Sequence, residues 1–256
     1  MFKILLIGDS CEDVYHYGHC GRLSPEAPVP VLKHHSTETR EGMCLNVRNN
    51  LVAFNLEVCV LTNNKMIRKE RFIDLKTKQH LLRTDFGESS KLEPLTELQL
   101  NKNDFSGLDA VIISDYDKGF LTNKNIKFII SKAKNVKVPV FVDSKKSDLS
   151  EFENCILKIN KLENSKVKEF PNNYELVVTH GKNGAMWNNK LFPTKACDVF
   201  DVCGAGDTFL AALASEYLKT KSFEKSIIFA NRCSKIAVQK FGTYVLTKRD
   251  INDLRV

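Results

Sequence analysis

The chain has no apolar run long enough to cross a lipid bilayer, although 43% of its 256 residues are hydrophobic. Its first eight residues lack the charged start and the small-residue cleavage site of a signal peptide, and have the pattern of a strand that enters a turn. We therefore expect no membrane partner and a location in the cytoplasm.

Blocks of like charge are also missing, even though the formal net charge is +7. The lysines are spread among Asp, Glu and Asn, which is typical of a solvated surface and not of a nucleic-acid-binding arm. The same net charge would fit a mildly basic entrance to a site that binds an anionic substrate and ATP.

The eight cysteines form no C-x-x-C pair, so they predict reduced, buried thiols and no disulfide framework.

Short apolar runs alternate with helical patterns along the chain. Strands are predicted at residues 3–7, 57–61, 110–114, 138–143, 155–159 and 176–179. Helices are predicted at residues 46–54, 123–134, 207–218 and 223–240, where apolar residues recur at three- and four-residue spacing. Continuous apolar strands between helices indicate a parallel sheet buried on both faces. We expect one α/β sandwich domain over residues 1–256.

Two segments, 29–40 and 71–85, do not fit this alternation, because their polar and apolar residues alternate as in strands with one wet face. We expect a small accessory sheet inserted in the main domain, with strands from about 10–40 and 70–87. The Lys- and Asn-rich stretch 160–173 predicts a short helix or a loop.

The strongest local signal is D-V-C-G-A-G-D-T-F at residues 201–209, where small residues precede a long apolar helix that begins around Asp207. A helix N-terminus preceded by glycines presents free N–H groups and the positive end of the helix dipole, so it can hold a phosphate. An Asp in the first turn could then take a proton from an attacking hydroxyl. On the G-x-G-D pattern alone, a tight turn with Asp207 as a helix cap would be the simpler interpretation.

Three further motifs favour the catalytic interpretation. Residues 160–163 read N-K-L-E, residues 179–184 read T-H-G-K-N-G, and residues 240–243 read K-F-G-T. With the glycine motif they resemble the ribokinase-like (PfkB-type) carbohydrate kinases. The resemblance implies an ATP-dependent sugar kinase with a ribokinase-like three-layer α/β/α sandwich, a mostly parallel central sheet and a small β-sheet lid.

The resemblance also implies roles for the residues that match its motifs. Gly204, Ala205 and Gly206 would form the anion hole, and Asp207 would be the catalytic base. ATP-binding positions are implied at Asn160, Thr179, Gly181, Gly184, Asn231 and Gly242. Glu163 would organise Mg²⁺ through water, although a helix cap with a solvated Glu is the alternative for N-x-x-E. Asp201 would be a candidate ligand for a monovalent cation such as K⁺, in a motif where Cys203 replaces a frequent Thr.

The amino-terminal third resembles a narrower group. I-G-D at residues 7–9, Asp13, Tyr15, Gly18 and R-L-S-P-E-A-P-V-P-V at residues 22–31 resemble the kinase domain that phosphorylates D-glycero-D-manno-heptose 7-phosphate at C1. The likeness continues at residues 83–86, 114–122 and 142–145. It implies substrate-binding roles for Asp9, Asp13, Gly42, Asn46, Lys118 and Lys145. Surface solvation is the alternative for the two lysines.

The chain also departs from this pattern. Met43 follows Gly42 where the family usually has a second glycine, so we expect added bulk where the sugar should approach. The chain is short between residues 62 and 71 and between 163 and 176, which predicts a missing or rebuilt wall of the substrate site. A kinase for another sugar, or a reduced non-catalytic nucleotide- or sugar-binding relative, therefore stays open. The resemblance further implies a homodimer through the lid strands.

Overall fold

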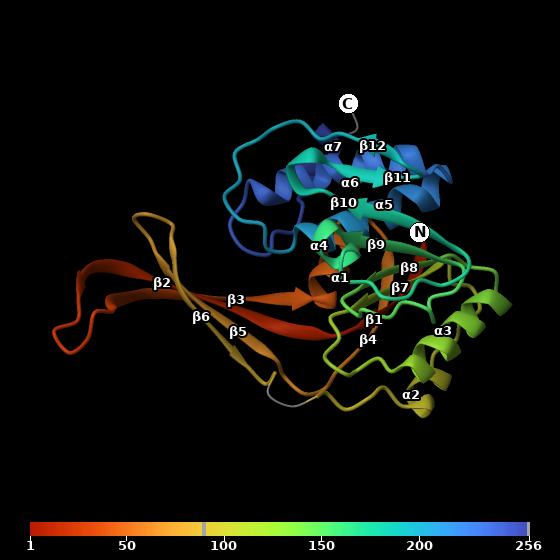
Figure 1. Cartoon of the computed structure of the whole chain (residues 1–256), viewed down its shortest axis with the longest axis horizontal. Helices are drawn as coiled ribbons and strands as arrows, with labels where there is room; N and C mark the ends of the chain where they lie inside the picture. Colours follow the sequence, from red (N-terminus) through yellow and green to blue (C-terminus); the bar gives the residue numbers. More distant parts are fainter. Residues whose placement is uncertain (89–90, 255–256) are drawn as a thin grey trace.

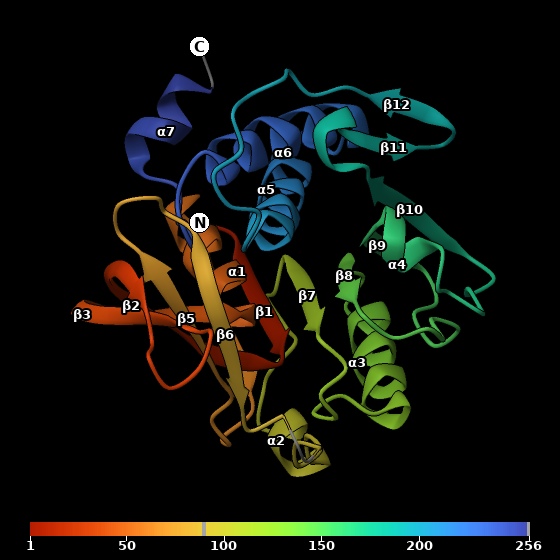
Figure 2. The same ribbon diagram turned by 60° about the vertical axis from the view of Figure 1, so that its left-hand side comes forward.

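The computed structural model describes residues 1–88 and 91–254. The body contains an eight-stranded sheet whose neighbours follow the order β12-β11-β10-β9-β8-β7-β1-β4 (Figures 1 and 2). Its strands are β1 (Lys3–Gly8), β4 (Glu57–Thr62), β7 (Ala110–Asp115), β8 (Val140–Ser144), β9 (Cys155–Asn160), β10 (Tyr174–Thr179), β11 (Ala185–Trp187) and β12 (Lys190–Phe192). All pairs from β4 to β10 are parallel, and β11 and β12 add an antiparallel hairpin. The predicted mostly parallel sheet is confirmed.

Both faces of this sheet are buried, as the continuous apolar strands predict. In β1, Ile4 and Leu6 pack into one core cluster, while Leu5 and Ile7 pack into the other. The first cluster lies under α1 (Cys44–Ala53), α5 (Ala205–Thr220), α6 (Phe223–Val238) and α7 (Lys248–Asp253). The second lies under α2 (Glu97–Asn101) and α3 (Asn123–Asn135). The result is the expected three-layer α/β/α sandwich.

A second, four-stranded sheet projects from the body, and we call it the small sheet (Figure 1). It has the order β3-β2-β5-β6, formed by β2 (Ser10–Leu23), β3 (Pro30–Met43), β5 (Arg68–Asp74) and β6 (His80–Phe86). Polar contacts tie it to the loop after α6: the Tyr15 hydroxyl accepts from the Thr243 N–H at 3.1 Å, and Arg40 Nη1 donates to the Phe241 carbonyl at 2.7 Å. The small sheet is thus attached to the carboxy-terminal part of the body.

The two shortened stretches have direct structural consequences. The main sheet ends at β4, because residues 63–67 lead straight into β5 of the small sheet. After α4 (Lys161–Asn164), residues 165–173 run to β10 without another helix. One edge of the body therefore lacks the covering elements that the resemblance would lead us to expect.

Met43 does not fill the substrate site as expected. Its side chain is buried in the core cluster on the α3 side, together with Ile7 and Cys11. The cost lies in the backbone, because Met43 has φ 55°, a region that favours glycine. The positive φ explains why a glycine suits this position, and the explanation does not depend on bulk beside a sugar.

The eight cysteines are reduced, as expected, but only Cys11, Cys44, Cys155 and Cys233 are buried. The expectation of burial is wrong for Cys59, which is exposed on the edge strand β4. Across residues 1–88 and 91–254, none of the helices has the length and apolar character needed to cross a membrane.

Candidate active site

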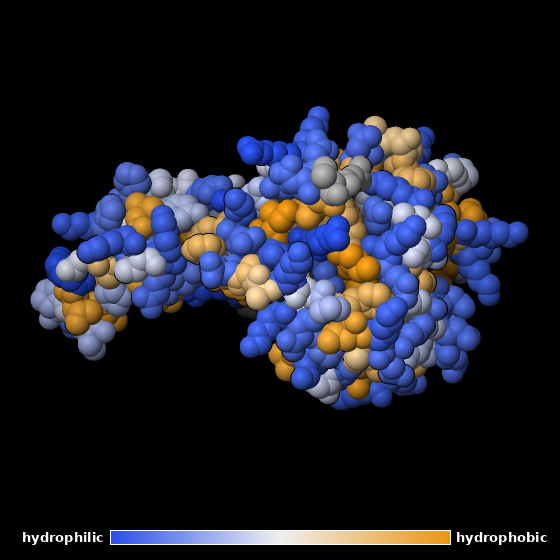
Figure 3. All heavy atoms as spheres, turned by 90° about the horizontal axis from the view of Figure 1, so that it is seen from above, coloured by the Kyte–Doolittle hydropathy of each residue, from blue (hydrophilic) through white to orange (hydrophobic). Residues whose placement is uncertain are grey.

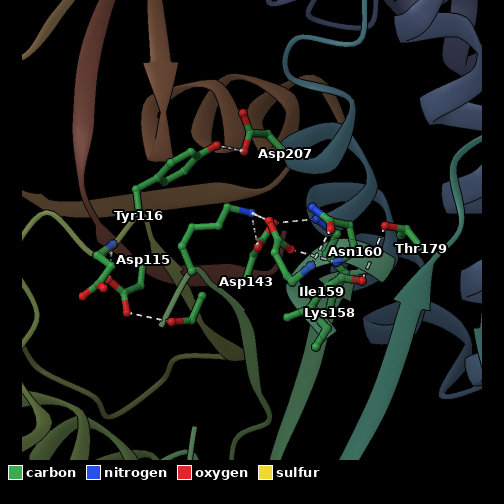
Figure 4. A network of polar contacts seen from close by, with 12 residues as sticks. Asp115, Tyr116, Asp143, Lys158, Ile159, Asn160, Thr179 and Asp207 are labelled. Atoms are coloured by element: carbon green, nitrogen blue, oxygen red, sulfur yellow. Dashed lines mark hydrogen bonds and ion pairs between the residues drawn. The ribbon is translucent and has the colours of Figure 1, made fainter. Parts of the chain in front are cut away.

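Polar side chains gather where the parallel strands of the main sheet end (Figure 4). Tyr116 directly follows β7, Asp143 lies near the end of β8, and Asn160 and Thr179 are the last residues of β9 and β10. In open α/β sheets, ligands bind at the carboxyl ends of the strands. This edge is therefore the place to look for substrate-binding groups.

The N-terminus of α5 points into the same region. Gly204 precedes the helix with φ 74°, and no side chain caps the first turn. The helix begins at Ala205, two residues before the expected start, because the left-handed Gly204 turns the chain directly into it. The Ala205 N–H donates to the Val202 carbonyl at 3.3 Å, and the N–H groups of Gly206 and Asp207 in this turn remain available to an anion.

Two cavities meet at this helix start. The inner cavity, of about 270 Å³, is lined by Tyr116, Asp143, Lys145, Lys158, Asn160, Thr179, Val202, Gly204, Gly206 and Asp207. The outer cavity, of about 380 Å³, has mainly apolar walls that include Val199, Phe209 and Val238, and it also contains Gly181, Gly184, Ala205 and Asn231. Thr179, Val202 and Gly206 line both cavities. An elongated ligand with an apolar end and an anionic end would fit across the two.

Asp207 is held rigidly in the first turn of α5. Its Oδ1 accepts from the Tyr116 hydroxyl at 2.8 Å, and its Oδ2 accepts from Asn46 Nδ2 at 2.9 Å. Burial raises the pKa of Asp207 to about 6, against the lowering effect of these two hydrogen bonds. A carboxylate with this pKa is ionised at neutral pH and is basic enough to accept a proton in a reaction.

A chain of ion pairs forms the opposite wall of the inner cavity. Asp143 accepts from Lys158 Nζ at 2.5 Å and from Lys145 Nζ at 3.0 Å. Lys145 also contacts Glu163 at 2.5 Å, and Glu163 and Asn160 cap the short helix α4 reciprocally. Burial raises the pKa of Asp143, but the two ammonium groups outweigh it and hold that pKa below its usual range. The same ion pairs raise the pKa of Lys145, so Asp143 and Lys145 are both charged at neutral pH.

Asp9 and Asp13 lie outside the two cavities but next to their walls. Asp9 Oδ2 accepts from the Tyr116 N–H at 2.6 Å, while its buried Oδ1 has no partner among the described residues. Burial and nearby Asp115 raise the pKa of Asp9 to about 6. Asp13 forms a buried ion pair with Arg71 at 2.5 Å. A side chain at Gly42 would come within 2.3 Å of Asp13, so glycine is required there.

Of the remaining predicted residues, Asn231 and Asp201 join segments of the body by hydrogen bonds, whereas Lys118 lies away from the cavities. Asn231 Nδ2 donates to the Phe192 carbonyl at 2.8 Å, which joins α6 to the β11–β12 hairpin beside the outer cavity. Asp201 accepts from the N–H groups of Cys203 and Gly242, both at 2.9 Å, and so ties the glycine motif to the later loop. Lys118 is set apart: it pairs with Glu88 at 2.6 Å and lines neither cavity.

Three polar residues of the inner cavity were given no role from the sequence: Tyr116, Asp143 and Lys158. Tyr116 and Asp143 belong to stretches that carry the family resemblance, so that signal was available. Lys158 had its own signal, a lysine within the otherwise apolar strand C-I-L-K-I-N. A charged residue in a buried strand requires a partner or a ligand.

Comparison with known proteins gives the family. The pattern of the pfkB family carbohydrate kinase matches residues 54–249. The bifunctional protein HldE of Nitratiruptor sp. is 32% identical over 303 aligned positions, which include 98% of this chain and 64% of the relative. That of Vibrio parahaemolyticus is also 32% identical, with 97% and 62% covered. The alignments exceed the 256 residues of this chain, so the relatives contain segments that it lacks.

The chain thus spans somewhat less than two thirds of these curated relatives. Among solved structures, ribokinase from Thermotoga maritima superposes with a TM-score of 0.70 at 17% identity, covering 100% of this chain and 99% of that one. Phosphofructokinase-2 from Escherichia coli in complex with potassium gives 0.76 at 15% identity, covering 99% and 98%. These likenesses establish the ribokinase-like fold. With the family pattern matched across most of its length, the chain belongs to the pfkB family of carbohydrate kinases.

Proposed function

We propose that this kinase transfers the γ-phosphate of ATP to a hydroxyl of a sugar or sugar phosphate, with D-glycero-D-manno-heptose 7-phosphate at O1 as the favoured acceptor. One observation carries the proposal: Asp207 is fixed by Tyr116 and Asn46 in the first turn of α5, where the two cavities meet. The outer cavity would take the nucleoside, and the inner cavity would take the phosphates and the acceptor hydroxyl.

In the proposed reaction the acceptor oxygen forms a bond to the γ-phosphorus, and the bond from that phosphorus to the β-phosphate oxygen breaks. The hydroxyl proton passes to Asp207, and ADP leaves. Phosphoryl transfer gains most from positioning and from stabilising the charge on the phosphoryl oxygens. The backbone N–H groups at the start of α5 supply that stabilisation in a half-buried setting, although the N–H of Ala205 already donates to the Val202 carbonyl at 3.3 Å.

Mg²⁺ suits the donor set of the inner cavity. The described residues contain no cluster of three or more Asp, Glu, His or Cys that would cage a metal. Mg²⁺ in kinases is held by one or two carboxylates together with phosphate oxygens and water. Asp143 in the cavity wall provides one such carboxylate, and Glu163, which pairs with Lys145 of that wall, provides another. The bound ion would neutralise phosphate charge. Asp201 stays our prediction for a monovalent cation, although both of its oxygens already accept backbone N–H bonds.

The choice of acceptor rests on the amino-terminal resemblance. Its most specific string, residues 22–31, forms the exposed end of the β2–β3 hairpin and does not line either cavity. ADP release should therefore be measured with Mg·ATP and a panel of heptose 7-phosphate, fructose 6-phosphate and ribose. Turnover on heptose 7-phosphate alone would support the favoured acceptor, and turnover only on another sugar would replace it. Nucleotide binding without turnover on any acceptor would favour the non-catalytic alternative.

The pH dependence of turnover should reflect Asp207. Because burial raises its pKa to about 6, the carboxylate loses its basic form as the pH falls below that value. We expect kcat/KM to fall about tenfold per pH unit below pH 6 and to level off above about pH 7. Nucleotide affinity measured across the same range separates this effect from ATP binding. A rate that rises toward acid would contradict the base assignment.

Asp9 is proposed to bind the acceptor. Its buried Oδ1 has no hydrogen-bond partner among the described residues, and a sugar hydroxyl could donate to it. Asp9→Asn should raise the acceptor KM about tenfold or more, since a hydrogen bond to a charged group is lost. The Kd for ATP should stay unchanged. The matched control is Asp109→Asn, at the opposite end of β7, where the carboxylate accepts from the Lys3 N–H. Equal effects on ATP and acceptor would count against this role.

The small sheet is proposed to act as a lid over the acceptor and as the contact of a homodimer. Supporting this, it exposes Leu23, Leu82 and Phe86, and the turn between β2 and β3 exposes Val29; each of these four side chains is more than half exposed. Apolar surface is visible among hydrophilic residues on this projecting part in Figure 3. A lid excludes water and so limits ATP hydrolysis. The cytoplasm, which supplies ATP, stays our proposed compartment.

A further inference from the structure

Lys158 is a buried ammonium in the middle of an apolar strand. Its side chain is 2% exposed, and its neighbours in β9 are otherwise mostly apolar. Burying a charge is costly unless it is paired and hydrogen-bonded. The Lys158 ammonium is therefore stabilised by each anionic or hydrogen-bonding partner that it gains.

The pairing of Lys158 is incomplete. Among the described residues its one hydrogen-bond partner is Asp143, at 2.5 Å, although an ammonium carries three donors. Its neighbour Lys145 differs, because it contacts both Asp143 and Glu163. Lys158 lines the inner cavity, so its spare donors have only that space for an acceptor. The unused capacity predicts an anionic ligand there.

Gly206 places this ammonium against the start of α5. A Cβ atom built on Gly206 would lie 2.9 Å from Lys158 Nζ and 3.8 Å from Asp143 Oδ2. The lysine head therefore lies directly over the backbone of the helix N-terminus, beside Asp207 in the same cavity. Free N–H groups and a fixed cation would act on the same anion.

We propose that Lys158 donates hydrogen bonds to the γ-phosphate of ATP, with Asp143 as the positioning residue that holds its ammonium over Gly206. This inference rests on the proposed kinase function and adds a charged contact to it. The phosphoryl group carries its charge on three oxygens during transfer, and Asp207 adds a further negative charge nearby. Lys158 offsets that repulsion from its position beside Gly206 at the start of α5.

The test is isothermal titration of Mg·ATP, ADP and AMP into wild type and Lys158→Met, without acceptor. Methionine keeps the length and removes the charge. Loss of a charge-assisted hydrogen bond should weaken ATP binding about tenfold or more. ADP and AMP, which lack the γ-phosphate, should bind within about threefold of wild type. Lys146→Met is the matched control: Lys146 pairs with buried Asp115 and lines neither cavity.

Unchanged ATP affinity, or equal weakening for ATP and ADP, would overturn the contact to the γ-phosphate. A wild type that binds none of the three nucleotides would overturn the proposed function, and this inference with it. Lys158→Met leaves Asp143 with one ammonium, and removing one partner of a buried pair is destabilising. If Lys158→Met does not fold, Lys158→Met with Asp143→Asn removes both charges, and the same ATP-to-ADP comparison decides.

Discussion

Asp207→Asn is expected to lower kcat for phosphoryl transfer about 10³-fold, the scale of a lost general base. Asparagine has nearly the same shape: its amide oxygen can accept from Asn46 Nδ2 and its amide N–H can donate to the Tyr116 hydroxyl, which reverses that bond, so the site should keep its geometry. The measurement is ADP release at saturating ATP and acceptor, with Asp109→Asn as the control. The Kd for ATP should change little, because the removed group acts on the acceptor proton.

The same variant should be at least as stable as wild type at neutral pH. Burial raises the folded-state pKa of Asp207 from 3.8 to about 6, so above pH 6 its ionisation costs the folded state free energy. Asparagine removes that cost. If Asp207→Asn lost activity because it unfolds, the result would argue against a specific role of Asp207 in the reaction. Lost activity with an unchanged or higher Tm would support the role of Asp207 as general base.

Gly206→Ala is expected to lower kcat about 10²-fold, comparable to the loss of one anion-hole donor. The added Cβ would lie 2.9 Å from Lys158 Nζ, so it must push the ammonium away from the helix start or enter the space for the phosphate. Because alanine favours a helix, we expect the protein to fold. ADP release and thermal unfolding should be measured together.

Gly21→Ala is the control for this substitution, because nothing lies within 4 Å of a Cβ at Gly21 in the small sheet. It should leave kcat unchanged. If Gly206→Ala kept full activity, the space in front of α5 would not hold the transferring group. If it lost activity only by unfolding, the Tm would fall in parallel with the rate.

Much of the body could be predicted because its signals are local. Each parallel strand is a short apolar run, and the glycine motif marks the start of α5 by residues adjacent in sequence. The hairpin β11–β12 and the helices α2 and α7 were missed because they have three to six residues. Elements this short have no reliable periodicity.

The polar network of the site could be predicted only in part. Asp207 stood out by its motif, but its two partners, Asn46 and Tyr116, lie 161 and 91 residues away along the chain. Asn46 was predicted to bind sugar, and the structure brings it to Asp207. Lys158 and Asp143 meet because β8 and β9 are neighbours in the sheet. Such pairings follow from topology, which a single sequence specifies only through the whole fold.

Asp207 is proposed to support the transfer of phosphate from ATP to a sugar hydroxyl. Phosphorus NMR of wild type and Asp207→Asn, each mixed with Mg·ATP and the best acceptor of the panel, tests it directly. We predict a new sugar phosphate resonance that grows in step with ADP for wild type and is nearly absent for the variant. ADP formed without phosphorylated sugar, or equal transfer by Asp207→Asn, would contradict the account.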